Sequence, residues 1–97
     1  SEMCIRDRTI SEASAKGIIV RGIQMGVPQF NHGNHSACAD IYEISLRSLL
    51  MLPDAKLSEA NRKLVSKSLL RLTEMDSSTE KAWEARSTFD KLMLSEL

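Results

Sequence analysis

The stretch that most constrains the fold is residues 33–52, where a turn is followed by a strongly apolar segment. Gly33 suits the position just past the end of a helix, because glycine adopts a positive φ without a steric penalty, and Asn34 or Ser36 can then cap the next helix. The apolar residues that follow cover more than one helical stripe: Ala37, Cys38, Ile41, Tyr42, Ile44, Leu46, Leu49, Leu50 and Leu52. Such a helix needs neighbours on at least two sides, so the sequence predicts a packed helical domain around it.

Three charged residues interrupt this apolar helix. Asp40, Glu43 and Arg47 stand at i, i+3 and i+7 and therefore form a single ridge. Glu43 and Arg47 have the spacing of a surface ion pair, which contributes about 0.3–0.5 kcal/mol. We interpret the ridge as a solvated face rather than as a set of catalytic groups.

A preceding helix is predicted over about residues 11–25, with Thr9 or Ser11 as its N-cap. Pro28 lacks a backbone donor and restricts the residue before it, so we expect the helix to kink or break there before a last turn through Phe30 and Asn31. Glycines weaken a helix by roughly 1 kcal/mol each relative to alanine. Their presence is explained if another helix approaches closely along one line of residues: Ala15, Ile19, Gly22 and Gly26.

Two further helices are predicted in the second half of the chain. The third is expected to be capped by Asp54 or Ser58 and to reach about Met75, and its inward stripe recurs at intervals of three and four residues: Leu57, Ala60, Leu64, Val65, Leu69, Leu72 and Met75. The fourth begins near Ser78 and turns its apolar face inward: Ala82, Ala85, Phe89, Leu92 and Met93. The chain has no alternating β pattern, so the predicted fold is all-α, a compact four-helix bundle made of two helical hairpins.

Charge and hydropathy exclude two classes of partner. Thirteen basic and thirteen acidic side chains balance, which leaves no net field to attract nucleic acid. The longest weakly polar run, residues 17–27, is far shorter than the roughly 20 apolar residues that a membrane span requires. We therefore expect neither a nucleic-acid partner nor a membrane span.

The first eight residues have no apolar period and resemble the translation of sequencing-adapter read-through. We expect residues 1–8 to be a non-native leader and residues 9–97 to form one helical domain. The natural start is then expected to be missing, so the domain either stands alone or belongs to a longer protein.

Two family resemblances centre on the first turn. Six residues resemble the second half of a tetratricopeptide repeat: Phe30, Gly33, Cys38, Tyr42, Leu46 and Pro53. Residues 26–34 together with residues 38–43 also resemble a motif of uncharacterised bacterial helical modules that occur alone or appended to other domains. These resemblances imply a helical hairpin and a family, and they imply no particular activity.

A candidate metal or redox site lies in the same turn. His32, His35 and Cys38 are spaced three apart, and imidazole with thiolate suits zinc or a similar metal. As a nucleophile, Cys38 would need a lowered pKa. The alternative is two exposed turn histidines and a small buried thiol, and we favour it because a fourth ligand and a third orienting residue are not evident.

The sequence shows no other catalytic constellation, since the Glu-x-x-His motif of helical di-iron sites is absent. We therefore expect a non-catalytic module without a cofactor, which binds a protein or peptide through Met25, Phe30, His35 and Trp83. A metal- or redox-responsive domain is the second hypothesis. Trp83 with Arg86 has two interpretations, an exposed patch or a core-edge aromatic covered by the guanidinium, and the second is favoured.

Overall fold

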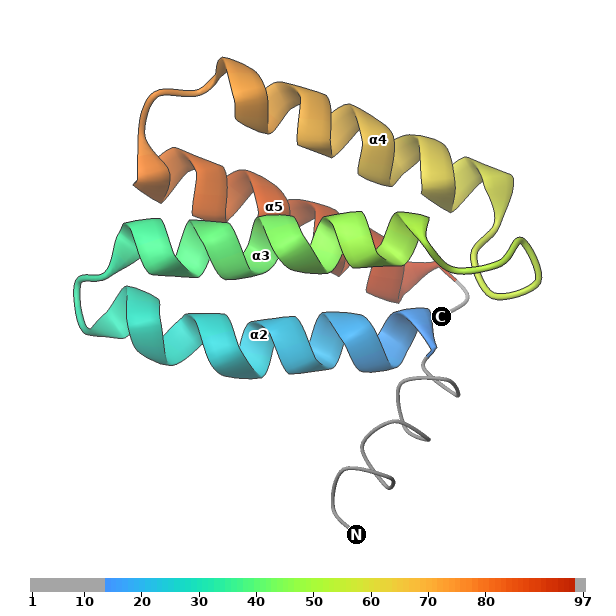
Figure 1. Cartoon of the computed structure of the whole chain (residues 1–97), viewed down its shortest axis with the longest axis horizontal. Coiled ribbons are helices and arrows are strands. Elements are labelled where there is room, and N and C mark those ends of the chain that lie inside the picture. The colour runs from blue at the N-terminus through green and yellow to red at the C-terminus, as the bar shows by residue number, and fades with distance from the viewer. Residues whose placement is uncertain (1–13, 96–97) are drawn as a thin grey trace, which may run out of the picture.

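The computed structural model describes residues 14–95, which form four α-helices and no strand. Helices α2 (Ala15–Asn31), α3 (His35–Leu50), α4 (Glu59–Glu74) and α5 (Ser78–Leu94) run up and down in turn (Figure 1). The α2–α3 and α4–α5 connections lie at one end of the domain, and the α3–α4 connection lies at the other. The predicted compact all-α fold of four helices is confirmed, whereas the proposed leader lies outside the described residues.

Helix α3 is the element on which the others pack, since it contacts α2, α4 and α5 (Figure 1). Its buried residues include Tyr42, Leu46 and Leu49, while Glu43 and Arg47 form the expected ion pair at 3.2 Å. The predicted apolar coverage was too wide at one position, because Ile44 is 63% exposed. Ile44 lies beside the charged ridge, on the one side of α3 that no neighbouring helix covers.

Helix α2 packs on α3 through small residues. Its buried positions are Ala15, Ile19, Gly22 and Gly26, the line along which the sequence predicted a close approach. A Cβ atom added at Gly22 would overlap the Ser45 side chain, and one at Gly26 would overlap the ring of Tyr42. Glycine is therefore required at these two positions by the separation of the two helices.

We expect Gly26→Ala to destabilise the domain by about 1–3 kcal/mol, as overpacked cores do, although alanine is the better helix former. The Tyr42 ring cannot move away easily because it is itself buried. Gly17→Ala is the matched control: Gly17 is exposed, and its nearest obstacle is the exposed Ser14 hydroxyl at 3.3 Å. Chemical denaturation should show a stability equal to or above that of the wild type for Gly17→Ala, and equal losses for both variants would contradict the close-packing argument.

The ends of α2 differ from the prediction. Ser14 is the N-cap, and its hydroxyl accepts a hydrogen bond from the backbone N–H of Gly17 at 3.1 Å, while the expected caps Thr9 and Ser11 lie outside the described residues. The helix continues without a break through Pro28, and its last turn includes Phe30 and Asn31 as expected, while a kink at Pro28 stays a prediction. Pro28 lies within the last turn, where the loss of one backbone hydrogen bond interrupts little of the helix.

The turn between α2 and α3 depends on Gly33, which has a φ of 86° as expected. The backbone N–H groups of Gly33 and Asn34 donate to the carbonyls of Phe30 and Gln29 at 3.0 and 2.8 Å. These two carbonyls at the C-terminal end of α2 therefore have hydrogen-bond partners. Asn34 occupies the N-cap position of α3, but its side chain donates to the Gln29 side chain at 3.2 Å instead of capping the helix.

Serine caps begin the last two helices. The Ser58 hydroxyl accepts a hydrogen bond from the backbone N–H of Asn61 at 3.2 Å, so Ser58, rather than the alternative Asp54, is the N-cap of α4. Ser77 caps α5 by accepting from the N–H of Glu80 at 3.3 Å, one residue before the expected start. The α3–α4 connection is held by Arg62, whose guanidinium donates to the carbonyls of Leu50 and Leu52 at 2.9 Å each.

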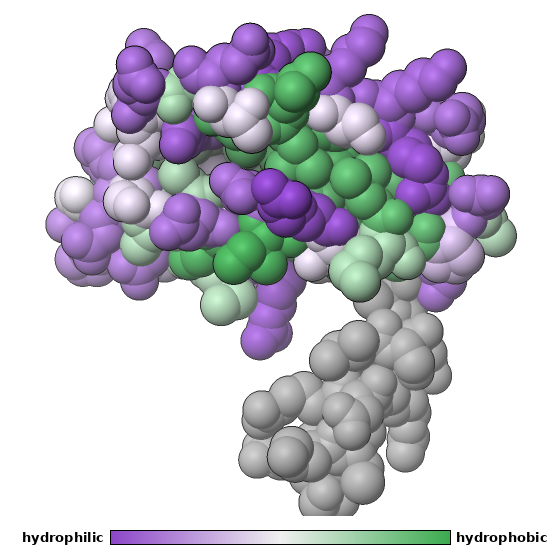
Figure 2. All heavy atoms as spheres, turned by 45° about the horizontal axis from the view of Figure 1, so that its top comes forward, coloured by the Kyte–Doolittle hydropathy of each residue, from purple (hydrophilic) through white to green (hydrophobic). Residues whose placement is uncertain are grey.

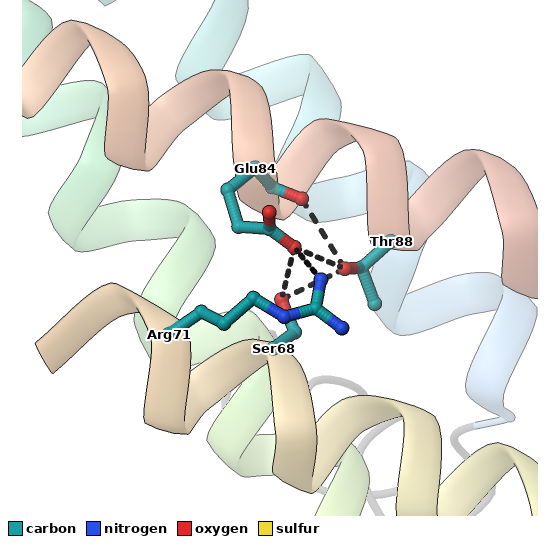
Figure 3. A network of polar contacts seen from close by, with 4 residues as sticks. All are labelled: Ser68, Arg71, Glu84 and Thr88. Atoms are coloured by element: carbon teal, nitrogen blue, oxygen red, sulfur yellow. Dashed lines mark hydrogen bonds and ion pairs between the residues drawn. The ribbon is translucent and has the colours of Figure 1, made fainter. Parts of the chain in front are cut away.

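A polar network joins α4 to α5 (Figure 3). The buried Thr88 hydroxyl donates to the Ser68 hydroxyl at 2.7 Å, and Ser68 donates to the Glu84 carboxylate at 3.5 Å. Arg71 binds the same carboxylate at 3.1 Å. Since each buried hydroxyl has a partner and the carboxylate has a cation, this network fixes the register of the two helices without leaving a polar group unsatisfied.

Candidate functional site

The candidate site is an apolar groove between α2, α3 and α5, and its volume is about 230 Å³. Each helix contributes one face to it, and the lining residues are Val27, Phe30, Asn31, Cys38, Tyr42, Ala82, Trp83 and Arg86. The groove exists because α2 makes few contacts with α5, so that α3 forms a floor between two walls that do not close over it.

Aromatic rings form one end of this groove. The ring of Phe30 meets the indole of Trp83 edge to face, with centroids 5.7 Å apart and an interplanar angle of 75°. On its other side Phe30 stacks on the His35 ring at 4.1 Å. The Nδ1 atom of His35 lies 2.7 Å from the Thr79 hydroxyl, so this α3 side chain contacts both α2 and α5. The three rings therefore form one cluster, in which Phe30 contacts both of the others.

The sequence named four residues as a partner-binding set, and the structure brings three of them together. Phe30 and Trp83 line the groove, and His35 supports Phe30 from behind. Met25 is 51% exposed but does not line the groove. Trp83 is 62% exposed, which corresponds to the less favoured of its two interpretations. Binding by this set stays a prediction.

The floor of the groove contains two buried titratable groups. Burial raises the pKa of the Cys38 thiol, and the hydroxyl of Tyr42 and the charge of Arg86 oppose this rise only in part. Burial likewise raises the pKa of Tyr42, with a further contribution from Cys38. Both groups are therefore neutral at pH 7, and a nucleophilic thiolate at Cys38 is disfavoured.

Arg86 is the one charged residue among those that line the groove. Its Nε lies 3.5 Å from Asp90 on the next turn of α5, in an ion pair whose acidic side chain is 64% exposed. The same Nε atom is buried and makes no hydrogen bond, so the contact with Asp90 is electrostatic rather than a formed hydrogen bond. Asp90 therefore offsets the positive charge of Arg86 only in part, and the guanidinium also interacts with the neutral Tyr42 hydroxyl.

The alternative metal site does not assemble from the residues that the sequence suggested. The Nδ1 atom of His32 lies 2.7 Å from the Pro28 carbonyl, His35 contacts Thr79, and Cys38 is buried. Within residues 14–95, no three His, Cys, Asp or Glu side chains are grouped so that they could hold a metal ion. The geometry gives the hypothesis of a metal-responsive domain no support.

Several lining residues were missed by the sequence analysis, notably Val27, Asn31 and Ala82. A signal was present, because Val27 with Asn31 and Cys38 with Tyr42 are i, i+4 pairs, and Ala82 with Arg86 is another. Each pair identifies one helical face. The separation of those faces depends on the angles between helices, which sequence periodicity does not contain.

Apolar side chains are also exposed on a second face of the domain. Figure 2 turns α4 towards the viewer and shows an apolar area that hydrophilic residues surround and partly interrupt. Ile44 of α3 and Leu70 of α4 are among the exposed apolar side chains, at 63% and 65%. Across residues 14–95, no helix is long and apolar enough to cross a membrane.

No protein-family model, curated protein or solved structure matches this chain. The tetratricopeptide-like character of the first hairpin and the likeness to bacterial helical modules therefore stay predictions.

Proposed function

We propose that this domain is a non-catalytic interaction or accessory module, which binds a segment of a partner protein in the groove between α2, α3 and α5. The observation that supports the proposal is Trp83, a large aromatic residue that is 62% exposed at the rim of an apolar groove. Exposed tryptophan beside a pocket is typical of the residues that dominate binding energy at protein interfaces.

The size of the groove favours a side chain of a partner over a whole small molecule. Pockets for drug-sized ligands usually measure about 300–1,000 Å³. The groove measures about 230 Å³ and opens to solvent beside Trp83, so it accommodates one or two inserted side chains. An extended or helical segment that passes across the opening can place an apolar anchor inside.

A binding role is also supported by the packing of the aromatic rings around the groove. Phe30 is held between the rings of His35 and Trp83, and Tyr42 meets the ring of Phe89 edge to face at 5.3 Å. Side chains fixed before binding lose little conformational entropy when a partner arrives. No such argument favours catalysis, because the Cys38 thiol is buried and its pKa is raised.

Selection from a displayed library of random peptides tests the proposal. We expect enriched peptides to bind the wild-type domain and to lose at least about tenfold in affinity for Trp83→Ala, as interface hot spots do. Leu70→Ala is the matched control, because Leu70 is 65% exposed on α4, away from the groove.

Isothermal titration with both variants gives the decisive comparison. If the affinity of the peptides fell for Leu70→Ala but not for Trp83→Ala, the binding surface would lie on another face of the domain. The absence of any enriched peptide, together with no resonance shift at Phe30 or Trp83 in the presence of the pooled library, would contradict the proposed function.

A further inference from the structure

Two of the polar side chains that line the groove share one chemical property. The guanidinium of Arg86 and the indole of Trp83 are hydrogen-bond donors with no acceptor atom. Both residues line the groove, together with the amide of Asn31, and no acidic side chain is among the lining residues. An occupant therefore finds apolar walls beside a rim that requires acceptors and favours negative charge.

The one anionic partner of Arg86 among the described ion pairs is weakly bound, and its other contact, the Tyr42 hydroxyl, is neutral. Its ion pair with Asp90 is long, at 3.5 Å, and Asp90 is mostly exposed, so solvent screens the attraction. A carboxylate brought into the groove would instead meet the guanidinium beside apolar surface, where water is excluded and a charge-assisted hydrogen bond is stronger. The charge of the groove thus complements an acidic ligand.

We infer that the occupant is a peptide segment in which a large apolar side chain stands next to a carboxylate. The apolar side chain enters between Val27, Phe30 and Trp83, and the carboxylate pairs with Arg86. This inference rests on the proposed function and specifies the chemistry of the partner for the same groove.

Three short capped peptides test this assignment, each with a central leucine and with glutamate, glutamine or lysine beside it. Binding is followed by heteronuclear NMR of the labelled domain and by the fluorescence of Trp83, which is the one tryptophan in the sequence. We expect the glutamate peptide to bind about tenfold tighter than the glutamine peptide, the gain typical of one charge-assisted hydrogen bond, and the lysine peptide to bind most weakly.

Arg86→Gln should abolish the preference for glutamate over glutamine while the glutamine peptide keeps its affinity. Arg47→Gln is the matched control, because Arg47 forms a similar i, i+4 ion pair with Glu43 on a face away from the groove. Thermal denaturation of both variants identifies any loss of folding that would explain a change in binding.

The outcomes separate this inference from the proposed function. Equal binding of the three peptides with shifts at Phe30 and Trp83 would overturn the acidic preference and leave the binding groove in place. Loss of the preference in Arg47→Gln would also overturn it. Self-association of the domain that is abolished by Trp83→Ala would identify a second copy as the occupant and reject the acidic peptide, whereas the absence of shifts with every peptide would count against the groove itself.

Discussion

Phe89→Ala is expected to lower the free energy of unfolding by about 3–5 kcal/mol, the range for large aromatic residues removed from a core. Phe89 is fully buried on α5 and meets the ring of Tyr42 edge to face, with centroids 5.3 Å apart. The alanine variant loses the buried apolar surface of the ring, leaves a cavity, and removes an aromatic contact that joins α5 to α3. Equilibrium unfolding in urea, followed by far-ultraviolet circular dichroism, measures the loss.

Trp83→Ala is the matched control for this substitution, because it removes an aromatic residue from the same helix at a position that is 62% exposed. Its expected cost is no more than about 1 kcal/mol, the level of an exposed aromatic contact. Phe89→Leu keeps part of the buried volume and should be intermediate, which makes the comparison useful even where Phe89→Ala does not fold. Similar losses for Trp83→Ala and Phe89→Ala would contradict the placement of the core.

The second large effect is expected in α3, where Leu46→Ala and Tyr42→Ala should each cost about 2–5 kcal/mol. Leu46 is fully buried and Tyr42 is 3% exposed, on the helix that contacts all three others. Truncation at either position therefore leaves a cavity that no single neighbouring helix can fill by moving. The unfolding midpoint and the slope of the denaturation curve distinguish a loss of stability from a loss of cooperativity.

Ile44→Ala on the same helix provides the control for α3. Ile44 is 63% exposed, so its truncation should change stability by no more than about 0.5 kcal/mol. If Ile44→Ala proved as costly as Leu46→Ala, the orientation of α3 would be wrong, and the original expectation of apolar coverage at Ile44 would be restored.

Local chemistry made much of the fold predictable. Gly33 adopts the expected positive φ, and Ser58 caps α4, because both roles depend on a single residue and its immediate neighbours. The glycines of α2 predicted a close helical neighbour, and Gly22 and Gly26 are indeed buried against α3. Of the two outcomes expected at Pro28, a break does not occur, because the proline lies within the last turn of α2, where one backbone hydrogen bond is lost at little cost.

Local sequence patterns predicted the four helices of residues 14–95, the turn at Gly33 and the buried character of α3, because periodicity, caps and turn residues act over a few positions. The sequence also indicated Phe30, His35 and Trp83 as candidate binding residues, but it did not predict that their side chains lie close together. Their proximity depends on how α2 and α5 sit on α3, and that arrangement follows from side chains packing across helices far apart in the chain. Tertiary structure alone therefore decided that a groove stays open beside Trp83, with Arg86 as its one charge.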